Sequence, residues 1–281
     1  MNAAKLFKTA LKAFIIGSTM TVPGFSGGSM AMILGEYDTL IESVPGLLRK
    51  KEFRESFLYL FIFLIAGLAG VFIISKPLSI LLENHFMAVM YFFLGAVIAT
   101  IPSIIRSSGI TPADCSIHGI LSYAACIVAG CIIVFSIRLI PEGVFTPSLT
   151  TDFISVLEQI IGGILLSIGF VLPGISISYL LVVTGLYGTV LNSLSNLNIL
   201  PMIPLGIGGV IGVFTLTGFL TWAMRKHSKI TYMVILGFLI GSIASVFPGL
   251  PAGSGIITCL VSFIAGGLSI FVLSKAESQG F

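Results

Sequence analysis

The chain has 281 residues, of which 56% are hydrophobic and 9% are charged, and its formal net charge is +3. Soluble domains carry about 25% charged residues, so this composition cannot cover a water-facing surface and excludes an ordinary soluble enzyme. The mean hydropathy of +1.13 instead predicts a polytopic membrane protein with one membrane domain, residues 1–281. The small net charge gives no indication of nucleic acid as a partner.

Long apolar runs without alternation predict an all-α fold. A membrane-spanning helix needs about 20 apolar residues, whereas a membrane barrel is built from shorter, alternating strands. Stretches of the required length lie at approximately 56–75, 86–105, 117–140, 203–224, 231–248 and 255–274. Two further apolar regions, 9–41 and 153–191, are interrupted in the middle and do not fit single spans.

The two interrupted regions repeat each other at an offset of 150 residues, with PGFSGGSMAMILGEYDT at 23–39 and PGISISYLLVVTGLYGT at 173–189. The identical pairs are Pro23/Pro173, Gly24/Gly174, Ser26/Ser176, Gly35/Gly185, Tyr37/Tyr187 and Thr39/Thr189. Three apolar spans follow each copy, so the chain divides into repeat one, 1–140, and repeat two, 150–281. The N-terminal lysines before an apolar run resemble a signal peptide, but the repeated motif directly after them predicts mature structure.

The positions of the Lys and Arg residues predict that each interrupted region enters the membrane and returns to the same side. Lysines precede the first region and the basic stretch 49–54 follows it, and both clusters favour the cytoplasm. If 9–41 is a re-entrant hairpin turning at Pro23–Gly28, all of the 14 Lys and Arg residues except Lys76 and Arg138 fall inside. Two simple crossings would give a weaker bias, so the hairpin is favoured.

Three full spans after each hairpin make the second half enter from the opposite side. The halves are therefore expected to be inverted repeats, each a re-entrant helical hairpin plus three transmembrane helices, with cytoplasmic N- and C-termini. Many secondary transporters have this architecture and bind substrate where broken helices meet near the membrane midplane.

The Pro-Gly break in each hairpin predicts an anion site. Proline ends a helix and glycine permits unusual dihedral angles, and the helix that restarts offers N–H groups and the positive end of its dipole. In the first hairpin these donors belong to Gly27, Gly28, Ser29 and Met30, and the hydroxyls of Ser26 and Ser29 add to them. Two such turns would bind phosphate or carboxylate; a packing kink in each helix is the alternative.

Charged side chains near the breaks are further candidates. Glu36 and Asp38 in the first hairpin and Glu158 in the second either relay protons or lie at a solvated interface. Arg138 ends its span on the outer side, against the charge rule, where it either captures an anionic headgroup or extends towards water.

Metal and cofactor chemistry is not expected. The four cysteines form no C-x-x-C pair, and the three histidines are not spaced as ligands on one helix face. A lipid phosphatase would need a nucleophile beside a general acid or base, and the histidines are not near either Pro-Gly break. We therefore expect no metal, no cofactor and no enzyme activity.

The motif PGFSGGSMAMILGEYDTLI and its second copy LPGISISYLLVVTGLYGTV resemble the bacterial polyprenyl-phosphate transporter family, over nearly the whole chain. The resemblance implies transfer of undecaprenyl phosphate from the outer to the inner leaflet of the cytoplasmic membrane, which recycles the carrier of envelope polymers. The residues implied to build the two phosphate-binding turns are Pro23, Gly24, Ser26, Gly27 and Gly28 in the first and Pro173, Gly174 and Ser176 in the second. Ile177 and Gly188 depart from the family pattern, which has a small and an acidic residue there, so an equal role for the second turn stays open.

The predicted function is an alternating-access translocase of polyprenyl phosphate in the bacterial inner membrane, with the phosphate between the hairpin tips. A secondary transporter of a small soluble anion is the alternative, because a site of backbone donors would serve either substrate. A membrane-facing opening for an apolar tail distinguishes the two, since only a lipid substrate needs one. The oligomeric state and the energy source stay open.

Overall fold

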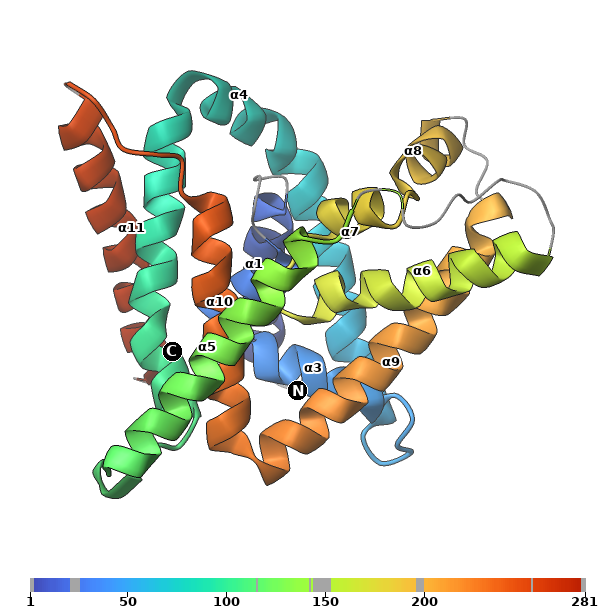
Figure 1. The fold of residues 1–281 in the computed structure, drawn as a ribbon, viewed down its shortest axis with the longest axis horizontal. Helices are drawn as coiled ribbons and strands as arrows, with labels where there is room; N and C mark the ends of the chain where they lie inside the picture. Colours follow the sequence, from blue (N-terminus) through green and yellow to red (C-terminus); the bar gives the residue numbers. More distant parts are fainter. Residues whose placement is uncertain are drawn as a thin grey trace.

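All secondary structure in the described part of the chain is helical, as the predicted all-α class requires. The computed structural model (Figure 1) describes residues 3–20, 26–114, 116–141, 143, 153–195, 200–253 and 255–278. Its α-helices are α1 (Ala3–Thr19), α2 (Gly27–Ile33), α3 (Tyr37–Gly46), α4 (Phe53–Ser107), α5 (Ile117–Arg138), α6 (Phe153–Val171), α7 (Ile177–Val183), α8 (Tyr187–Ser195), α9 (Ile203–Lys226), α10 (Ser228–Val246) and α11 (Gly255–Ser278). The 3-10 helices η1 (Pro112–Asp114) and η2 (Leu200–Met202) precede α5 and α9.

Six stretches among the described residues are long and apolar enough to cross a membrane. They are Phe53–Ile74, Lys76–Ser107, Ile117–Ile137, Phe153–Val171, Ile203–Lys226 and Gly255–Val272. The predicted span 231–248 corresponds to α10, whose apolar part, Ser228–Ala244, is shorter. α6 differs from the expectation of a half-crossing arm, because its 19 residues are long enough to cross alone.

Large apolar side chains cover the outside of the long helices. Phe72 of α4 is 78% exposed, Leu121 of α5 is 69% exposed and Phe271 of α11 is 65% exposed. Contiguous apolar surface on this scale is rare on soluble monomers, whereas lipid solvates it. The chain is therefore a multi-pass membrane protein.

α4 contains two spans joined by a bend. His85 has φ −138° and ψ 40°, outside the helical region. The first α4 segment (residues 53–84) thus ends there and the second α4 segment (residues 86–107) begins. In Figure 1 the helix turns over at the top of the molecule and descends beside α11. The two segments contain the separate spans predicted at 56–75 and 86–105.

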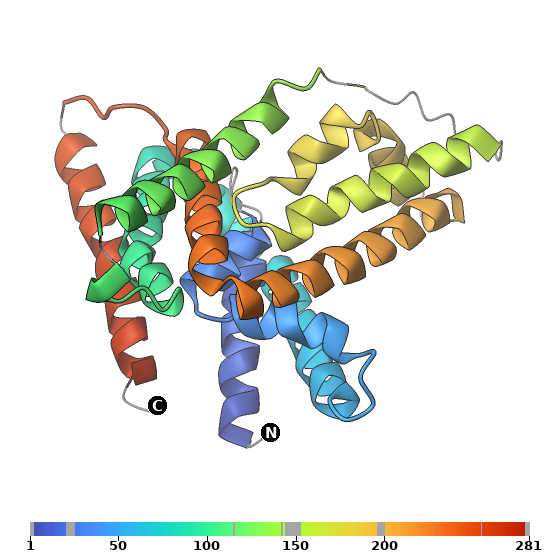
Figure 2. The same cartoon turned by 60° about the horizontal axis from the view of Figure 1, so that its bottom comes forward.

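Small residues bring helices into backbone contact within each half of the chain. A Cβ atom on Gly17 of α1 would lie 1.9 Å from the carbonyl oxygen of Gly67 in the first α4 segment. A Cβ atom on Gly163 of α6 would lie 2.1 Å from the carbonyl oxygen of Leu205 in α9. Helices in lipid associate through such close packing, and α6 and α9 run side by side in Figures 1 and 2.

The other long helices pair across the two halves. The second α4 segment packs against α11 through glycine. A Cβ atom on Gly95 would lie 2.0 Å from the carbonyl oxygen of Phe263, and one on Gly266 would lie 1.9 Å from that of Phe92. Gly130 in α5 and Gly237 in α10 approach equally closely, because a Cβ atom on either would lie 2.9 Å from the other's Cα. Each half therefore depends on the other for two of its helix contacts.

The short helices α2 and α3 lie in the centre of this arrangement. Met30, Ala31, Ile33 and Tyr37 are buried in the main apolar core. α2 contacts α1, α4 and α6, and α3 contacts α4 and α9. The first interrupted region thus places α2 and the start of α3 in the core of the molecule.

Each interrupted region has a second break that the sequence analysis does not predict. α2 and α7 each end in a Schellman motif, with Gly35 at φ 67° and Gly185 at φ 72°. The N–H groups of Gly35 and Glu36 donate to Met32 and Ala31. Gly185 and the residue after it repeat this pattern at the end of α7. The arm after each Pro-Gly break is therefore two short helices, because glycine adopts the left-handed conformation that closes a helix.

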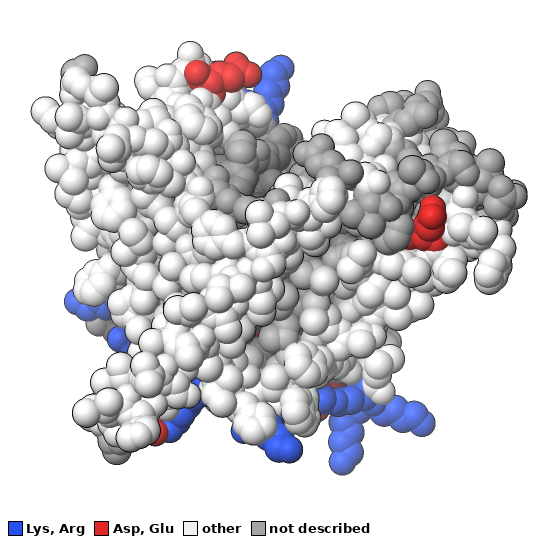
Figure 3. Space-filling model, in the orientation of Figure 1, with Lys and Arg blue, Asp and Glu red and all other residues white. Residues whose placement is uncertain are grey.

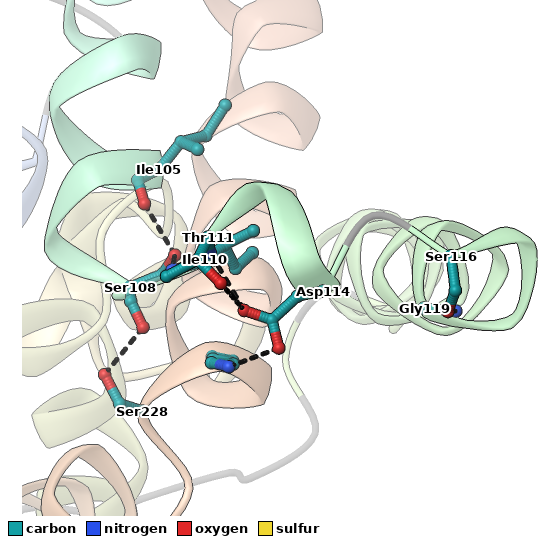
Figure 4. Close-up of polar contacts among 9 residues, drawn as sticks. Ile105, Ser108, Ile110, Thr111, Asp114, Ser116, Gly119 and Ser228 are labelled. Carbon is teal, nitrogen blue, oxygen red and sulfur yellow. Dashed lines mark hydrogen bonds and ion pairs between the residues drawn. The ribbon is translucent and has the colours of Figure 1, made fainter.

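The loop between α4 and α5 is tied to the start of α10 (Figure 4). Asp114 accepts hydrogen bonds from the backbone and hydroxyl of Thr111, at 2.9 Å and 2.8 Å, and forms an ion pair with Lys229. Ser228 donates to the carbonyl oxygen of Ser108 at 3.1 Å. The hydrogen bonds from Lys229 and Thr111 lower the pKa of Asp114 to about 2. Its charge is therefore present at neutral pH and holds the loop against α10.

Candidate functional site

The tips of the two interrupted regions meet through the polar groups of three buried residues. Ser26 Oγ and Ser29 Oγ lie 3.0 Å apart. The backbone N–H of Gly174 donates to Ser26 Oγ at 3.2 Å and to Ser29 Oγ at 2.8 Å. We call Ser26, Ser29 and Gly174 the tip cluster. It joins residues that are 145 and 148 positions apart in the chain, so the structure brings the two predicted turns into direct contact.

The hydroxyl hydrogens of the two serines follow from their neighbours. Ser26 Oγ accepts from the N–H groups of Ser29 and Gly174. Either hydroxyl could donate in the contact between the two serines; because a hydroxyl has two lone pairs and one hydrogen, we assign Ser26 as the donor to Ser29 Oγ. Ser29 Oγ then accepts from Ser26 and Gly174, and its own hydrogen can be donated outside the cluster. An anion is the kind of acceptor that suits it.

The first turn of α2 uses part of its donor capacity internally. Ser26 is the N-cap, and Ser29 N–H donates to its side chain at 3.2 Å. Met30 N–H donates to the carbonyl oxygen of Ser26, also at 3.2 Å. This differs from the expectation of four free donors, because an N-cap serine satisfies donors of the first turn. The N–H groups of Gly27 and Gly28 come before them in the first turn, where the helix itself provides no acceptor for them.

Gly28 packs directly on the second break. A Cβ atom at Gly28 would lie 3.3 Å from the backbone nitrogen of Pro173, and Pro173 is fully buried. A larger residue at 28 would therefore push the tips apart. Pro23 and Gly24 lie outside the described residues.

The second turn is not equivalent to the first. Ser176 is the N-cap of α7, and its carbonyl oxygen accepts from the N–H of Leu180 at 3.1 Å, but its side chain makes no cap hydrogen bond. The second turn contributes the N–H of Gly174 to the tip cluster and leaves Ser176 half-buried.

The tyrosines that match across the repeats also differ. Tyr37 is 1% exposed and donates to the carbonyl oxygen of Val171, the last residue of α6, at 2.9 Å. Tyr187 is 46% exposed. Tyr37 therefore links α3 to the end of α6. Its acceptor, Val171, comes three residues before Gly174 of the tip cluster.

Glu36 lies at the end of the first interrupted region in a buried ion pair. It is 9% exposed, its Oε1 lies 3.1 Å from Lys12 Nζ, and its Oε2 accepts from Tyr59 at 2.9 Å. The Glu36 carboxylate is therefore shielded from solvent inside the protein and paired with a cation. Lys12 and Tyr59 were not among the predicted candidates, since they come from α1 and α4 and no local sequence pattern connects them to Glu36.

A polar cavity of about 400 Å³ lies beside α3. Asp38 lines it and accepts a hydrogen bond from Tyr232 of α10. Glu42 and Arg225 also line it, with 3.2 Å between Glu42 Oε1 and Arg225 Nε. The wall of the cavity also contains Glu52, Glu55 and Lys5, so it carries four carboxylates and two cations.

The other predicted charged residues lie elsewhere. Glu158 is half-exposed in the second turn of α6, at the opposite end of that helix from Val171. Arg138 is the last residue of α5, and its side chain lies outside the described part of the structure. Among the described residues, no group of three or more His, Cys, Asp or Glu side chains is placed to hold a metal ion.

Known proteins resemble the chain over most of its length. Residues 16–273 match the undecaprenyl phosphate translocase-like family. The chain belongs to this family. A polyprenyl-phosphate transporter of Staphylococcus aureus is 31% identical over 278 residues, which are 96% of each chain. A polyprenyl-phosphate transporter of Vibrio cholerae is 28% identical over 253 residues, covering 85% of this chain and 77% of the relative. No solved structure matches the chain.

The match to the undecaprenyl phosphate translocase-like family includes the first interrupted region from residue 16 onward, the whole of the second, and every residue of the tip cluster. The family expected from the two Pro-Gly motifs is therefore confirmed.

Proposed function

We propose that this chain transports undecaprenyl phosphate, or a related polyprenyl phosphate, from the outer to the inner leaflet of the bacterial cytoplasmic membrane for reuse in envelope synthesis. The observation that carries the proposal is the tip cluster, in a chain whose relatives are named polyprenyl-phosphate transporters. The Ser29 hydroxyl and the N–H groups of Gly27 and Gly28 are donors of the kind that bind phosphate. The role is binding and transfer, without enzymatic chemistry.

The proposed architecture is a pair of inverted repeats, 1–140 and 150–281, each with a re-entrant hairpin and three spans. The packing of α1 on α4, which matches that of α6 on α9, supports it, as do the reciprocal contacts across the halves. The Schellman motif after each Pro-Gly break supports it as well. A pseudo-two-fold axis in the membrane plane would pass near the tips, where transporters of this architecture bind substrate.

The cytoplasmic side is assigned from charge. Most of the Lys and Arg side chains visible in Figure 3 lie along its lower edge. The N-terminal end of α1 and the C-terminal end of α11 point to the same side in Figure 2. By the positive-inside rule, we place this edge and both termini in the cytoplasm.

The proposed transport step exchanges partners at the tip cluster. Gly174 N–H now donates to the serine oxygens, so the tips are closed on each other. A phosphate oxygen that replaces those acceptors keeps the buried N–H group paired, which avoids the cost of an unsatisfied donor. The halves would then rock around the bound phosphate and open it to one leaflet and then the other.

Three carboxylates and one arginine complete the proposal. Glu36 and Asp38, behind the first tip, are our candidates for coupling transport to protons, because intramembrane carboxylates serve as relays. Glu158 is the candidate at the other end of α6. Arg138 would capture the phosphate headgroup from the outer leaflet.

Exposure of undecaprenyl phosphate on intact cells tests the function. In a host depleted of this protein and of redundant translocases, a fluorescent probe that binds the lipid should accumulate on the outer face. The wild-type chain and Ser176→Ala should reverse the accumulation, whereas Gly27→Glu, which places a carboxylate at the site, should not. Unchanged staining together with slower uptake of labelled inorganic phosphate would instead establish the soluble-anion transporter.

A further inference from the structure

An apolar groove lies beside the second break, between α6, α7 and α9. Its volume is about 580 Å³, within the range of about 300–1,000 Å³ that is typical of small-molecule sites. The residues that line it are Gly163, Leu166, Phe170, Ile177, Leu181, Val190, Met202, Leu205, Gly206, Gly209, Val210, Val213 and Phe214. We propose that this groove holds the part of the isoprenoid chain next to the phosphate, and the proposal rests on the function proposed above.

Two lining residues of the groove are close in sequence to the second turn. Ile177 is the first residue of α7 and directly follows Ser176 of the second turn. Phe170 lies in the last turn of α6, four residues before Gly174 of the tip cluster. A lipid whose phosphate contacts the tip cluster would therefore place its first isoprene units against these two side chains.

Glycine keeps the groove open. A Cβ atom on Gly206 would meet no atom within 4 Å, and one on Gly209 would meet only the Gly163 carbonyl oxygen, at 3.9 Å. These two glycines are therefore not required for helix packing, unlike Gly208 between them, whose Cβ would lie 2.0 Å from the Ile160 carbonyl oxygen. The open positions form a smooth apolar wall that accommodates a methyl-branched chain.

Lipid tails are as apolar as the side chains of the groove, so moving the isoprenoid from bilayer to protein contributes little to binding affinity. We therefore expect the groove to affect the rate of transport. Its advantage is a fixed path that keeps the tail apart from the polar tip cluster while the phosphate changes sides. Filling the groove should therefore slow long-chain lipids most.

Gly206→Phe tests the groove, with Gly218→Phe as the matched control. Both glycines lie on α9 with no atom within 4 Å of a Cβ, but Gly218 does not line the groove. In proteoliposomes, Gly206→Phe should lower the transfer rate of a long-chain polyprenyl phosphate about tenfold, which corresponds to a barrier increase of about 1.4 kcal/mol. Transfer of geranyl phosphate, whose chain is short, should change less. Gly218→Phe should behave as the wild type.

The outcomes separate the groove from the transport function. Equal long-chain rates for Gly206→Phe and Gly218→Phe, with an active wild type, would overturn the groove alone. A wild type that moves neither lipid would overturn both proposals.

Photo-crosslinking gives an independent test on the wild-type protein. A polyprenyl phosphate with a diazirine in its first isoprene units should label peptides of α6, α7 and α9, and excess unlabelled polyprenyl phosphate should suppress the labelling. Equal labelling by a diazirine phospholipid, unaffected by that competitor, would identify the groove as a site for bulk lipid and overturn the proposal.

Discussion

At the residue scale, the two serines of the tip cluster have different tasks. Ser26 caps α2 and accepts from Ser29 and Gly174, so its oxygen is fully used within the protein. Ser29 retains a hydrogen for a ligand. Loss of Ser26 should therefore affect stability first, and loss of Ser29 should affect transport first.

We expect Ser29→Ala to lower transport about ten- to a hundredfold, because a hydrogen bond to a charged group contributes about 1.5–3 kcal/mol. Its thermal stability should fall little, since Gly174 N–H retains Ser26 Oγ. Ser26→Ala should lose about 1 kcal/mol of stability with the cap, and Ser176→Ala should be close to wild type. Flux assays on reconstituted protein, paired with thermal unfolding in detergent, measure both effects; equal transport by Ser29→Ala and Ser176→Ala would contradict the assignment.

Glu36 and Lys12 should be strongly coupled. Their side chains are 12% and 19% exposed, and removal of one member of a buried ion pair costs about 3–5 kcal/mol because the attraction that offsets burial of the other charge is lost. We expect Glu36→Gln and Lys12→Met each to be destabilising, and the double variant to recover much of the loss. The exposed pair Arg49–Glu52, at 41% and 52%, should show a coupling below about 1 kcal/mol in the same thermal assay. Additive losses at Glu36 and Lys12 would show that the pair contributes no coupling.

At the element scale, the long helices other than α6 were predictable from the sequence, whereas the division of each hairpin arm into two short helices was not. Twenty apolar residues in a row leave a helix as the main way to satisfy the backbone in lipid, so the spans follow from composition. The second break depends on Gly35 and Gly185, which the repeat makes visible as identical residues. Glycine alone does not reveal that it closes a helix, because most glycines in the described part of the chain lie inside helices.

The site was predictable in part for the same reason. The Pro-Gly motifs identify both tips, since each breaks an apolar run. The contact of Gly174 with Ser26 and Ser29 depends on how the halves pack, and the partners of Glu36 come from two other helices. Such contacts over long sequence separations are fixed by tertiary structure and leave no local pattern.

The Schellman glycines should resist substitution. An L-residue in the left-handed region costs about 1–2 kcal/mol, so Gly35→Ala and Gly185→Ala should each destabilise the protein by that amount. Gly218→Ala, inside α9 with open space around it, should instead be neutral or stabilise by about 0.5–1 kcal/mol. Thermal unfolding of the three purified variants tests the contrast, and a stabilised Gly35→Ala would show that the motif is not required at that position.

At the scale of the whole molecule, the cross-half contacts make the two halves interdependent. We expect separate chains of residues 1–143 and 144–281 to assemble when they are produced together and to be degraded when produced alone. The reason is that α5 then lacks α10 and the second α4 segment lacks α11. Co-purification and membrane levels measure this. Gly237→Val in the second fragment should prevent assembly, since a Cβ there would lie 2.2 Å from the Ile127 carbonyl oxygen. A first fragment that accumulates stably alone would contradict the expectation.

The contacts of α5 with α10 and of α4 with α11 also affect the order in which the protein assembles in the membrane. During synthesis, α4 and α5 leave the ribosome and enter the bilayer before α10 and α11 have been translated. The face of α5 that packs on α10 and the face of the second α4 segment that packs on α11 are therefore exposed to lipid until those helices are inserted. We therefore expect the two halves to dock laterally only after α10 and α11 have entered the bilayer.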